Sequence, residues 1–248
     1  MNPLDLTQIW GVRLGFGLAI GAVVGSFAAT AALRTEQGRG AMAGRSSCDH
    51  CARTLTFGET VPFLGYAASR GQCQTCGSPI DRFHLIGEGL GAVGLSACWL
   101  LQPNPIGFFT GLLCLFLLGS ALIDTKTLRL PDGLTLGIAG LALILAFLDH
   151  RWVEGLLAAL STVLCLYGLK WFLERRNNKP MFGLGDVKLA GALSLWLGLR
   201  TPDMLVIAAL LGLAFILITR RKDVLPFGPM LAVASFVTGV CIPEGWLS

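Results

Sequence analysis

Two aspartates lie at the edges of hydrophobic stretches, where a chain in lipid would ordinarily avoid a charge. Asp124 closes the apolar run 106–123, and Asp186 follows a Gly-Leu-Gly sequence at the start of another apolar run. Acidic residues in a membrane are costly and usually functional. Two carboxyl groups a few Å apart do not readily ionise together, so they can share one proton and activate water for peptide hydrolysis. Taken alone, Asp124 is equally consistent with a solvated helix end.

Asp186 is harder to explain as a helix end. The apolar run 187–199 after it is too short to cross a bilayer. We therefore expect the helix to begin near Met181, which would place the carboxylate inside the spanning segment. Gly183 and Gly185 would permit an irregular or closely approached backbone beside the acid, a feature that membranes tolerate only against protein or a wet cavity.

Two further acids lie close to apolar segments. Asp132 follows a proline and precedes an apolar run, a pattern that predicts a helix cap. Glu88 lies near the start of the segment 85–101, either as a helix-start carboxylate favoured by the dipole or as a buried acid close to the site. The candidate catalytic pair is therefore Asp124 and Asp186. The candidate supporting residues are Gly183, Gly185 and Glu88.

Four cysteines form two CxxC pairs in a polar stretch. Cys48 and Cys51 are separated by 21 intervening residues from Cys73 and Cys76. Each pair can supply two thiolates, and the returning chain can complete a tetrahedron, so the spacing predicts a structural zinc site. Disulfides are the alternative, but a reducing cytosol would disfavour them. A redox CxxC lacks its usual βαβ context, and His50 lies within one pair as a bystander.

The composition is that of a membrane protein. The chain has 248 residues, of which 54% are hydrophobic and 14% charged, and its mean hydropathy is +0.68. A helix needs roughly 20 apolar residues to cross about 30 Å of hydrocarbon. Eight stretches approach this length: 9–33, 85–101, 106–123, 133–148, 153–173, 181–199, 204–219 and 224–242. We therefore predict an all-α polytopic membrane protein with about eight transmembrane helices and a small zinc-binding cytoplasmic loop domain.

The distribution of basic residues orients these helices. If the segments alternate in direction, one side of the bilayer receives only Arg13, Arg151 and Arg200, whereas the other receives the remaining sixteen of the 19 lysines and arginines. Basic loops favour the cytoplasm, so both termini should face outward and the cysteine loop inward. This asymmetry also accounts for the net charge of +4, and sparse aromatic interleaving gives no indication of nucleic-acid binding.

The polar stretch divides the chain into three parts. We expect a first transmembrane helix in 1–33, a cytoplasmic zinc-binding domain in 34–84 and a transmembrane catalytic domain in 85–248. No basic region precedes the first apolar run and no small-residue cleavage site follows it, so we expect it to remain as an anchor. Its Gly17, Gly21 and Gly25 fall on one helix face suited to close packing.

These features together resemble one family. The CxxC pairs, Asp124 ahead of Leu-Pro-Asp, the Gly-Leu-Gly-Asp-Val-Lys-Leu sequence at 183–189 and the Pro-Phe-Gly-Pro sequence at 226–229 resemble the type IV prepilin leader peptidases, which are GxGD intramembrane aspartic proteases. The resemblance covers nearly the whole chain. It implies a multi-pass enzyme of the bacterial inner membrane in which Asp124 and Asp186 match the family's catalytic pair.

The resemblance also implies two reactions and their partners. Such an enzyme would cut the basic leader from type IV prepilins or type II secretion pseudopilins, and would then methylate the new amino terminus with S-adenosylmethionine. The sequence contains no Rossmann-type methyltransferase loop, so the cofactor site must be unconventional. Glu88 is our candidate for supporting the methylation step.

Two other functional classes remain as alternatives. A proton- or cation-coupled transporter could use Asp124, Asp186 and Glu88 as an ion path, but it would give no reason for a zinc loop. A zinc-dependent assembly scaffold would leave the aspartates replaceable. Cleavage of a prepilin by the purified protein separates these alternatives.

Overall fold

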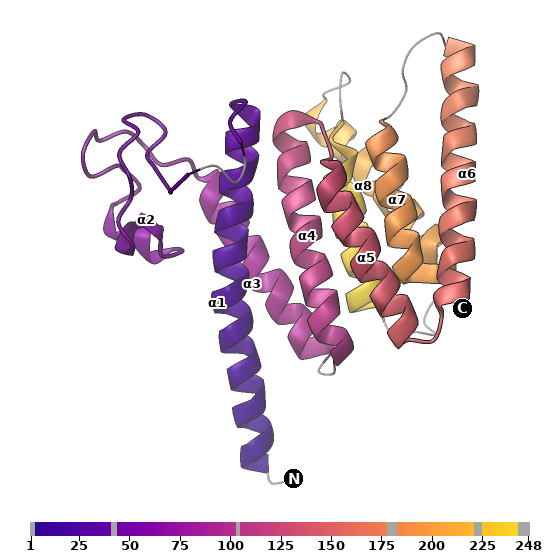
Figure 1. The fold of residues 1–248 in the computed structure, drawn as a ribbon, viewed down its shortest axis with the longest axis horizontal. Helices are drawn as coiled ribbons and strands as arrows, with labels where there is room; N and C mark the ends of the chain where they lie inside the picture. Colours follow the sequence, from indigo (N-terminus) through magenta and orange to yellow (C-terminus); the bar gives the residue numbers. More distant parts are fainter. Residues whose placement is uncertain (1–2, 41–43, 103–104, 178–182, 221–224, 243–248) are drawn as a thin grey trace.

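The protein is a bundle of helices with a small loop domain on one side (Figure 1). The computed structural model describes residues 3–40, 44–102, 105–177, 183–220 and 225–242. Within these ranges every extended element of regular structure is helical, and strand pairing is limited to two isolated β-bridges. The prediction of an all-α protein is confirmed.

Each of the eight predicted segments contains a helix. In chain order these helices are α1 (Pro3–Glu36), α3 (Phe83–Leu101), α4 (Pro105–Thr127), α5 (Asp132–Leu148), α6 (Trp152–Asn177), α7 (Leu184–Leu197), α8 (Thr201–Thr219) and α9 (Phe227–Phe236). A 3-10 turn (Gly198–Arg200) joins α7 to α8, and a π-helical turn (Val237–Cys241) extends α9. Five helical stretches are long and apolar enough to span a membrane, with α7 and α8 forming one of them. Helix α5 and the α9 stretch are shorter but also apolar.

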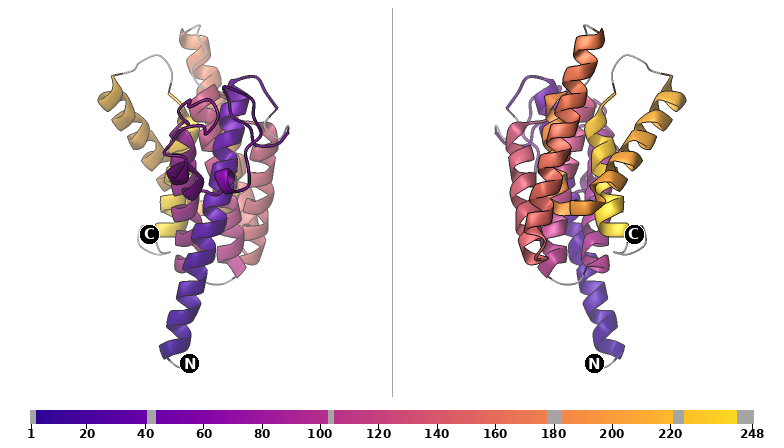
Figure 2. Two further views of the ribbon diagram at one scale, coloured as in Figure 1. Left: turned by 90° about the vertical axis from the view of Figure 1, so that its left-hand side faces the viewer. Right: turned by 90° about the vertical axis from the view of Figure 1, so that its right-hand side faces the viewer.

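One predicted helix boundary was wrong. Helix α7 begins at Leu184 after Gly183, and not near Met181, which lies outside the described residues. At the other end of α7 a 3-10 turn leads into α8, which runs back toward the end of the bundle where α7 begins (Figure 2). Asp186 is therefore in the first turn of its helix and not deep within it.

The bundle buries one apolar core and exposes another apolar surface. Leu113, Ile138, Leu189 and Leu231, from α4, α5, α7 and α9, are completely buried. By contrast, the outward face of α6 presents large side chains such as Leu157, which is 64% exposed. A helix that is apolar on its exposed face requires lipid around it. Figure 2 shows α8 leaning away from α9 toward the end of the bundle that carries the loop domain.

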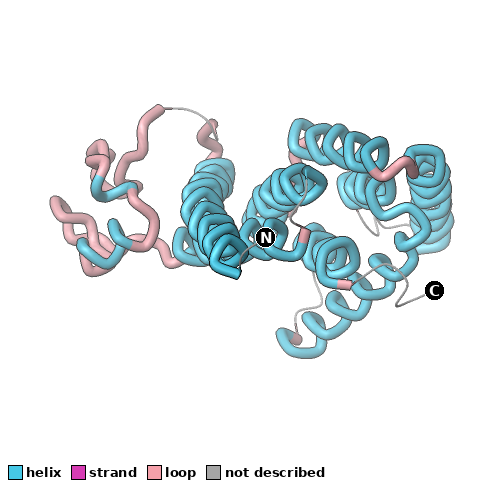
Figure 3. Tube along the Cα trace, turned by 90° about the horizontal axis from the view of Figure 1, so that it is seen from below, coloured by secondary structure: helices cyan, strands magenta, loops and turns pink. Residues whose placement is uncertain are grey.

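Helices α1 and α3 form a closely packed pair between the loop domain and the other helices (Figure 3). A Cβ atom added to Gly21 would collide with the carbonyl oxygen of Gly91, and one added to Gly25 would collide with that of Gly87. Small residues allow such backbone approach in membranes, where dispersion and hydrogen bonds drive helix association. The predicted packing face of the first helix is confirmed.

We predict that Gly25→Ala destabilises the protein, because the new methyl group meets a backbone atom that cannot rotate away. The expected loss in the free energy of unfolding is about 1–3 kcal/mol, as for other overpacked sites. Gly15→Ala is the matched control, since nothing lies within 4 Å of a Cβ at this position of the same helix. Thermal unfolding in detergent, followed by tryptophan fluorescence, measures both. Equal midpoints for the two variants would contradict the packing argument.

Candidate active site and metal centre

Asp124 is held at the C-terminal end of α4 by another helix. Its carboxylate is in a residue only 4% exposed, and its Oδ2 accepts a hydrogen bond of 3.0 Å from the backbone N–H of Gly228. Gly228 is in the first turn of α9, where backbone N–H groups have no partner within the helix. The start of α9 therefore presents a donor and the positive end of a helix dipole to a buried acid.

Asp186 is held by the start of its own helix. Gly183 is the N-cap residue of α7 and Asp186 the third helical residue, and the backbone N–H of Gly183 donates to the Asp186 carboxylate. This is the return half of a capping box, in which the N3 side chain reaches back to the N-cap amide. The sequence Gly-Leu-Gly-Asp thus orients its own carboxylate.

Gly185, between the N-cap residue and Asp186, contacts the connection between α4 and α5. A Cβ at Gly185 would lie 3.2 Å from the Cβ of Leu130, so the connection between α4 and α5 packs directly on the first turn of α7. Lys188, in the second turn of α7, forms an ion pair with Asp132 at 2.8 Å. These contacts bring the ends of α4 and α7 together, and the charge of Asp124 acts on Asp186.

Asp132 is not the helix cap that its position predicted. Pro131 is the N-cap residue of α5 and Asp132 the first helical residue. The Asp132 side chain is 72% exposed and takes the cation of Lys188. The proline fixes the extended backbone that the helix needs at its start, so the acid is free to form the ion pair.

Two carboxyl groups arranged in this way can perform acid–base chemistry on water. One is buried and the other is partly exposed, and each accepts a hydrogen bond from a neutral backbone N–H. Neutral donors orient the groups without supplying a compensating positive charge, so one carboxyl group can stay protonated while the other is ionised. A carboxylate can then take a proton from water while a carboxylic acid donates one.

Gly228 contacts Asp124, although the sequence indicated this glycine only as part of the Pro-Phe-Gly-Pro motif. Its contact with Asp124 spans 104 positions in the chain. A Cβ at Gly228 would lie 2.8 Å from the Asp124 Oδ2 atom, so the close approach requires glycine. A glycine between an aromatic residue and a proline at the start of an apolar helix is the signal that indicates such an approach.

The candidate metal centre consists of two matching turns in the segment between α1 and α3 (residues 44–82), which we name the cysteine domain. Ala52 N–H donates to Cys48 O at 2.9 Å, and Gly77 N–H donates to Cys73 O at the same distance. Ala52 and Gly77 also share a left-handed backbone, with φ of 57° and 69°. An isolated β-bridge closes the chain around each turn. The two CxxC pairs are therefore structural repeats.

The four sulfur atoms are spaced for one tetrahedral ion. All four lie within 4.8 Å of one another, with Cys48 Sγ 3.8 Å from Cys76 Sγ and Cys51 Sγ 4.0 Å from Cys73 Sγ. A tetrahedron with metal–sulfur bonds of about 2.3 Å has edges of about 3.8 Å, whereas a disulfide requires about 2.0 Å. The four predicted cysteines are therefore brought together and could hold a metal ion.

The backbone also prepares two of the four thiols, one in each turn, for a cation. Hydrogen bonds from the N–H groups of Cys76 and Thr75 lower the pKa of Cys73 to about 6. Those from Cys51 and His50 likewise lower the pKa of Cys48. Thiolates are the form that binds metal, so this donor set suits a cation. The role of His50 is that of a backbone donor beside the predicted ligands.

An ion pair supports the metal centre from one side. Arg53 donates to both carboxylate oxygens of Glu59, at 2.7 and 3.1 Å, and this pair lowers the pKa of Glu59 to about 2. The same guanidinium lies 3.9 Å from Cys73 Sγ. A bidentate arginine is more rigid than a single contact, so it fixes the turn at Glu59 against the metal centre.

Glu88 lies apart from the two aspartates. It is the sixth residue of α3 and only 6% exposed, so it is not a helix-start carboxylate. Its Oε1 accepts from Ser26 Oγ of α1 and its Oε2 from Phe63 N–H of the cysteine domain, each at 2.8 Å. Phe63 has a φ of 59° and is the N-cap residue of α2 (Leu64–Ala68). Glu88 thus attaches the cysteine domain to the α1–α3 pair.

An apolar cluster between α1 and α4 adjoins Asp124 in the chain. It includes Ala29, Ala32 and Ile123, and Phe83 packs against it. Asp124 follows Ile123 on α4, yet its carboxylate faces α9. The structure thus brings two of the three predicted acids together and places the third in the cysteine-domain interface.

Comparisons with known proteins match most of the chain to two family models. Residues 19–101 match the bacterial Peptidase A24 N-terminal domain, and residues 111–217 match the type IV leader peptidase family. The two matches include the four cysteines and both aspartates. No solved structure matches the chain.

Curated relatives align over much of their length. A prepilin leader peptidase/N-methyltransferase of Burkholderia pseudomallei is 33% identical over 92% of this chain and 85% of the relative. An enzyme of the same name from Klebsiella pneumoniae is 34% identical over 66% of this chain and 74% of the relative. A type 4 prepilin-like proteins leader peptide-processing enzyme of Escherichia coli is 30% identical over 78% of this chain and 74% of the relative.

We predict that the purified protein contains about one metal ion per chain, as a four-thiolate site requires. Changing Cys48 and Cys73 together to Ser should abolish metal binding, because one ligand is lost from each turn. Cys98→Ser with Cys165→Ser is the matched control, since neither belongs to the cluster. Elemental analysis of the detergent-purified proteins measures the content. Full occupancy in the Cys48/Cys73 variant would show that the ligand set is wrong.

Proposed function

This chain belongs to the type IV leader peptidase family, and we propose that it processes prepilins with the carboxyl pair Asp124 and Asp186. The substrates are type IV prepilins or type II secretion pseudopilins. After cleavage, the enzyme methylates the new amino terminus, a second activity that the names of its relatives also carry. Family membership argues against the transporter alternative.

The observation that carries the proposal is the joining of the ends of α4 and α7. Asp124 is oriented by Gly228 from α9, and Asp186 by Gly183 from its own helix. One ionised carboxylate takes a proton from water as the water attacks the scissile carbonyl. The protonated partner donates toward the developing oxyanion. Both roles need carboxyl groups, and an amide could perform neither.

The position of Asp124 and Asp186 relative to the membrane boundary matches the expected position of the scissile bond. Asp124 is near the C-terminal end of α4 and Asp186 in the first turn of α7. These helix ends lie at the end of the bundle that also carries the cysteine domain (Figure 1), and the positive-inside rule assigns this end to the cytoplasm. In the bacterial inner membrane, a basic leader would remain on this side while the apolar stem of the pilin lies in lipid. The scissile bond then falls at the boundary. The substrate helix must unwind there, because intrahelical hydrogen bonds and packing shield its carbonyl.

The cysteine domain supports the second activity. We propose that the bound metal is zinc, held by Cys48, Cys51, Cys73 and Cys76 in a structural site. Four thiolates leave no open position, so the metal folds the domain and does not activate water. S-adenosylmethionine supplies the methyl group when it is bound. The domain and Glu88 together provide the surface on which this step is arranged.

We predict that Asp124→Asn and Asp186→Asn each abolish leader cleavage, since an amide cannot exchange the required proton. Asp132→Asn is the matched control, because Asp132 is exposed and lies on the same end of the bundle. Incubation of each purified variant with a prepilin in detergent, followed by gel analysis, measures cleavage. Substantial cleavage by either of the first two would refute the pair. Loss of activity in Asp132→Asn would show that another acid is catalytic.

We also predict that Gly228→Ala lowers kcat/KM for cleavage by about 100-fold, because a displacement of about 1 Å in a catalytic group can have this effect. The added methyl group would meet the Asp124 carboxylate at 2.8 Å and push it from the backbone donor. Gly133→Ala in α5 is the control, since nothing lies within 4 Å of its Cβ. Unchanged kinetics in Gly228→Ala would mean that the Asp124 contact with α9 is unimportant for catalysis.

A further inference from the structure

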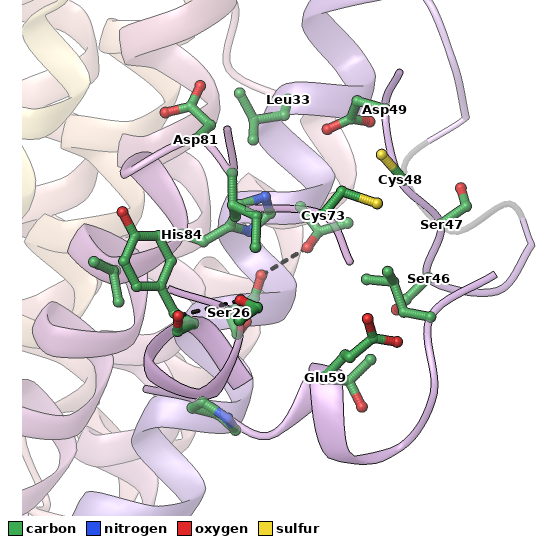
Figure 4. Close-up of a pocket in the computed structure, with 18 of the residues that line it drawn as sticks. Ser26, Leu33, Ser46, Ser47, Cys48, Asp49, Glu59, Cys73, Asp81 and His84 are labelled. Carbon is green, nitrogen blue, oxygen red and sulfur yellow. Dashed lines mark hydrogen bonds between the residues drawn. The ribbon is translucent and has the colours of Figure 1, made fainter. Parts of the chain in front are cut away.

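A cavity of about 550 Å³ lies between the cysteine domain and the α1–α3 pair (Figure 4). Ser26 and Leu33 of α1 and His84 of α3 lie on one side of it, and Cys48 and Glu59 of the cysteine domain lie on the other. This volume is in the range of pockets that enclose small organic ligands. The cavity lies at the interface of two parts of the protein, where such sites are common.

The acids around this cavity are not all neutralised. Asp49 forms an ion pair with Arg39, and Glu59 forms one with Arg53. Glu88, however, accepts only from a hydroxyl and a backbone N–H among the described contacts. A buried carboxylate keeps most of its unfavourable desolvation energy when its donors are neutral. It therefore favours a ligand that brings a positive charge.

A second acid, which is exposed, adds negative charge to a lining that also contains one buried cation. Asp81 accepts from the backbone N–H of Phe83 at 2.9 Å, and its charge acts on His84 together with those of Asp49 and Glu88. Arg34 also lines the cavity, and its guanidinium donates to the carbonyl oxygen of Arg45 at 3.0 Å. Carboxylates thus face His84 from the cysteine domain and from α3.

The remaining wall is apolar and aromatic. Phe27 and Leu33 of α1 and Tyr66 and Ile80 of the cysteine domain line the cavity beside the acids. Such a surface can cover a flat heterocyclic ring, while the acids bind a cation and hydroxyl groups. S-adenosylmethionine combines these features in one small molecule, since it has an adenine ring, a ribose, a sulfonium and an ammonium group.

We infer that this cavity is the S-adenosylmethionine site, with the Glu88 carboxylate facing the positive charge of the cofactor. The inference rests on the methylation step of the proposed function. In that step the neutral amine of the cleaved substrate forms an N–C bond to the methyl carbon as the C–S bond breaks. The positive charge passes from sulfur to nitrogen, and S-adenosylhomocysteine leaves as a neutral thioether. The amine has already given its ammonium proton to solvent.

With this cofactor site, cleavage and methylation take place at two different sites in the protein. Glu88 accepts hydrogen bonds from α1 and the cysteine domain, whereas Asp124 accepts one from α9. Cleavage and methylation would then use separate residues within one chain. The new amino terminus must move from the pair to the cavity, so methylation follows cleavage without sharing its catalytic groups.

Equilibrium binding of S-adenosylmethionine to the full chain in detergent tests the inference without any turnover. We expect Glu88→Gln to weaken binding by about tenfold, the effect of losing one charge-assisted contact. It should weaken binding of S-adenosylhomocysteine less, because that compound lacks the sulfonium charge. Thr30→Phe fills part of the cavity from α1 and leaves the Glu88 carboxylate unchanged. It should weaken binding of both ligands. Glu36→Gln makes the same Glu-to-Gln change on α1 outside the cavity. It should alter the affinity for neither ligand.

Metal content and thermal unfolding establish that each variant is folded. If Glu88→Gln and Thr30→Phe both bind S-adenosylmethionine as the wild type does, the location is wrong while the proposed function stands. A wild type that cleaves prepilin but does not bind the cofactor would overturn both the methylation step and this inference. If the variants lose affinity for the basic leader peptide and not for S-adenosylmethionine, the cavity holds the leader, and the inference is overturned.

Discussion

Three acids in this protein are held by backbone N–H groups at the starts of helices, and much of the arrangement follows from that constraint. Asp124 accepts from Gly228 in α9, Asp186 from Gly183 at the start of α7, and Glu88 from Phe63 at the start of α2. A carboxylate in a low-dielectric region needs donors, and the first turn of a helix has unused ones. Each contact therefore fixes how one helix meets another or how it begins.

The choice of neutral donors preserves the reactivity of these groups. A lysine beside Asp124 and Asp186 would favour the ionised form of both carboxylates, and they could then no longer share a proton. The two lysines closest in sequence form other contacts: Lys188 pairs with Asp132, and Lys126 lies over the ring of Phe83 and beside Glu36. The cations thus stabilise helix ends at the polar boundary, while the acids remain available for chemistry and for a cationic ligand.

Glycine makes these contacts possible in two different ways. Along α1 and α3 it removes side chains so that two backbones touch, which brings Ser26 within 2.8 Å of Glu88. At Gly228 and Gly185 it lets a helix start approach a carboxylate or a neighbouring connection. A packing requirement and a chemical requirement therefore fall on the same residue type. The consequence is that the shape of the membrane bundle and the geometry of its sites cannot be changed independently.

The sequence by itself determined the features that depend on composition and short spacing. Eight apolar stretches predicted the helices, and the cysteine spacing predicted the cluster, because two CxxC turns are local structures that need only one return of the chain. The catalytic pair remains a prediction, based on two acids at apolar boundaries and on a family motif. The glycine face of the first helix was also readable, since a repeat of four residues fixes one side of a helix.

Only the tertiary structure decided which partners these groups take. The contacts of Asp124 with Gly228 and of Glu88 with Ser26 join residues 104 and 62 positions apart, and no local pattern specifies such pairings. For the same reason Asp132 was expected to cap a helix, although in the fold it meets Lys188 across 56 positions. Helix α7 begins three residues later than expected, with Gly183 as its N-cap residue and the N–H of Gly183 bound to the Asp186 carboxylate. Local propensity fixes where helices form, whereas the burial of charge fixes how they meet.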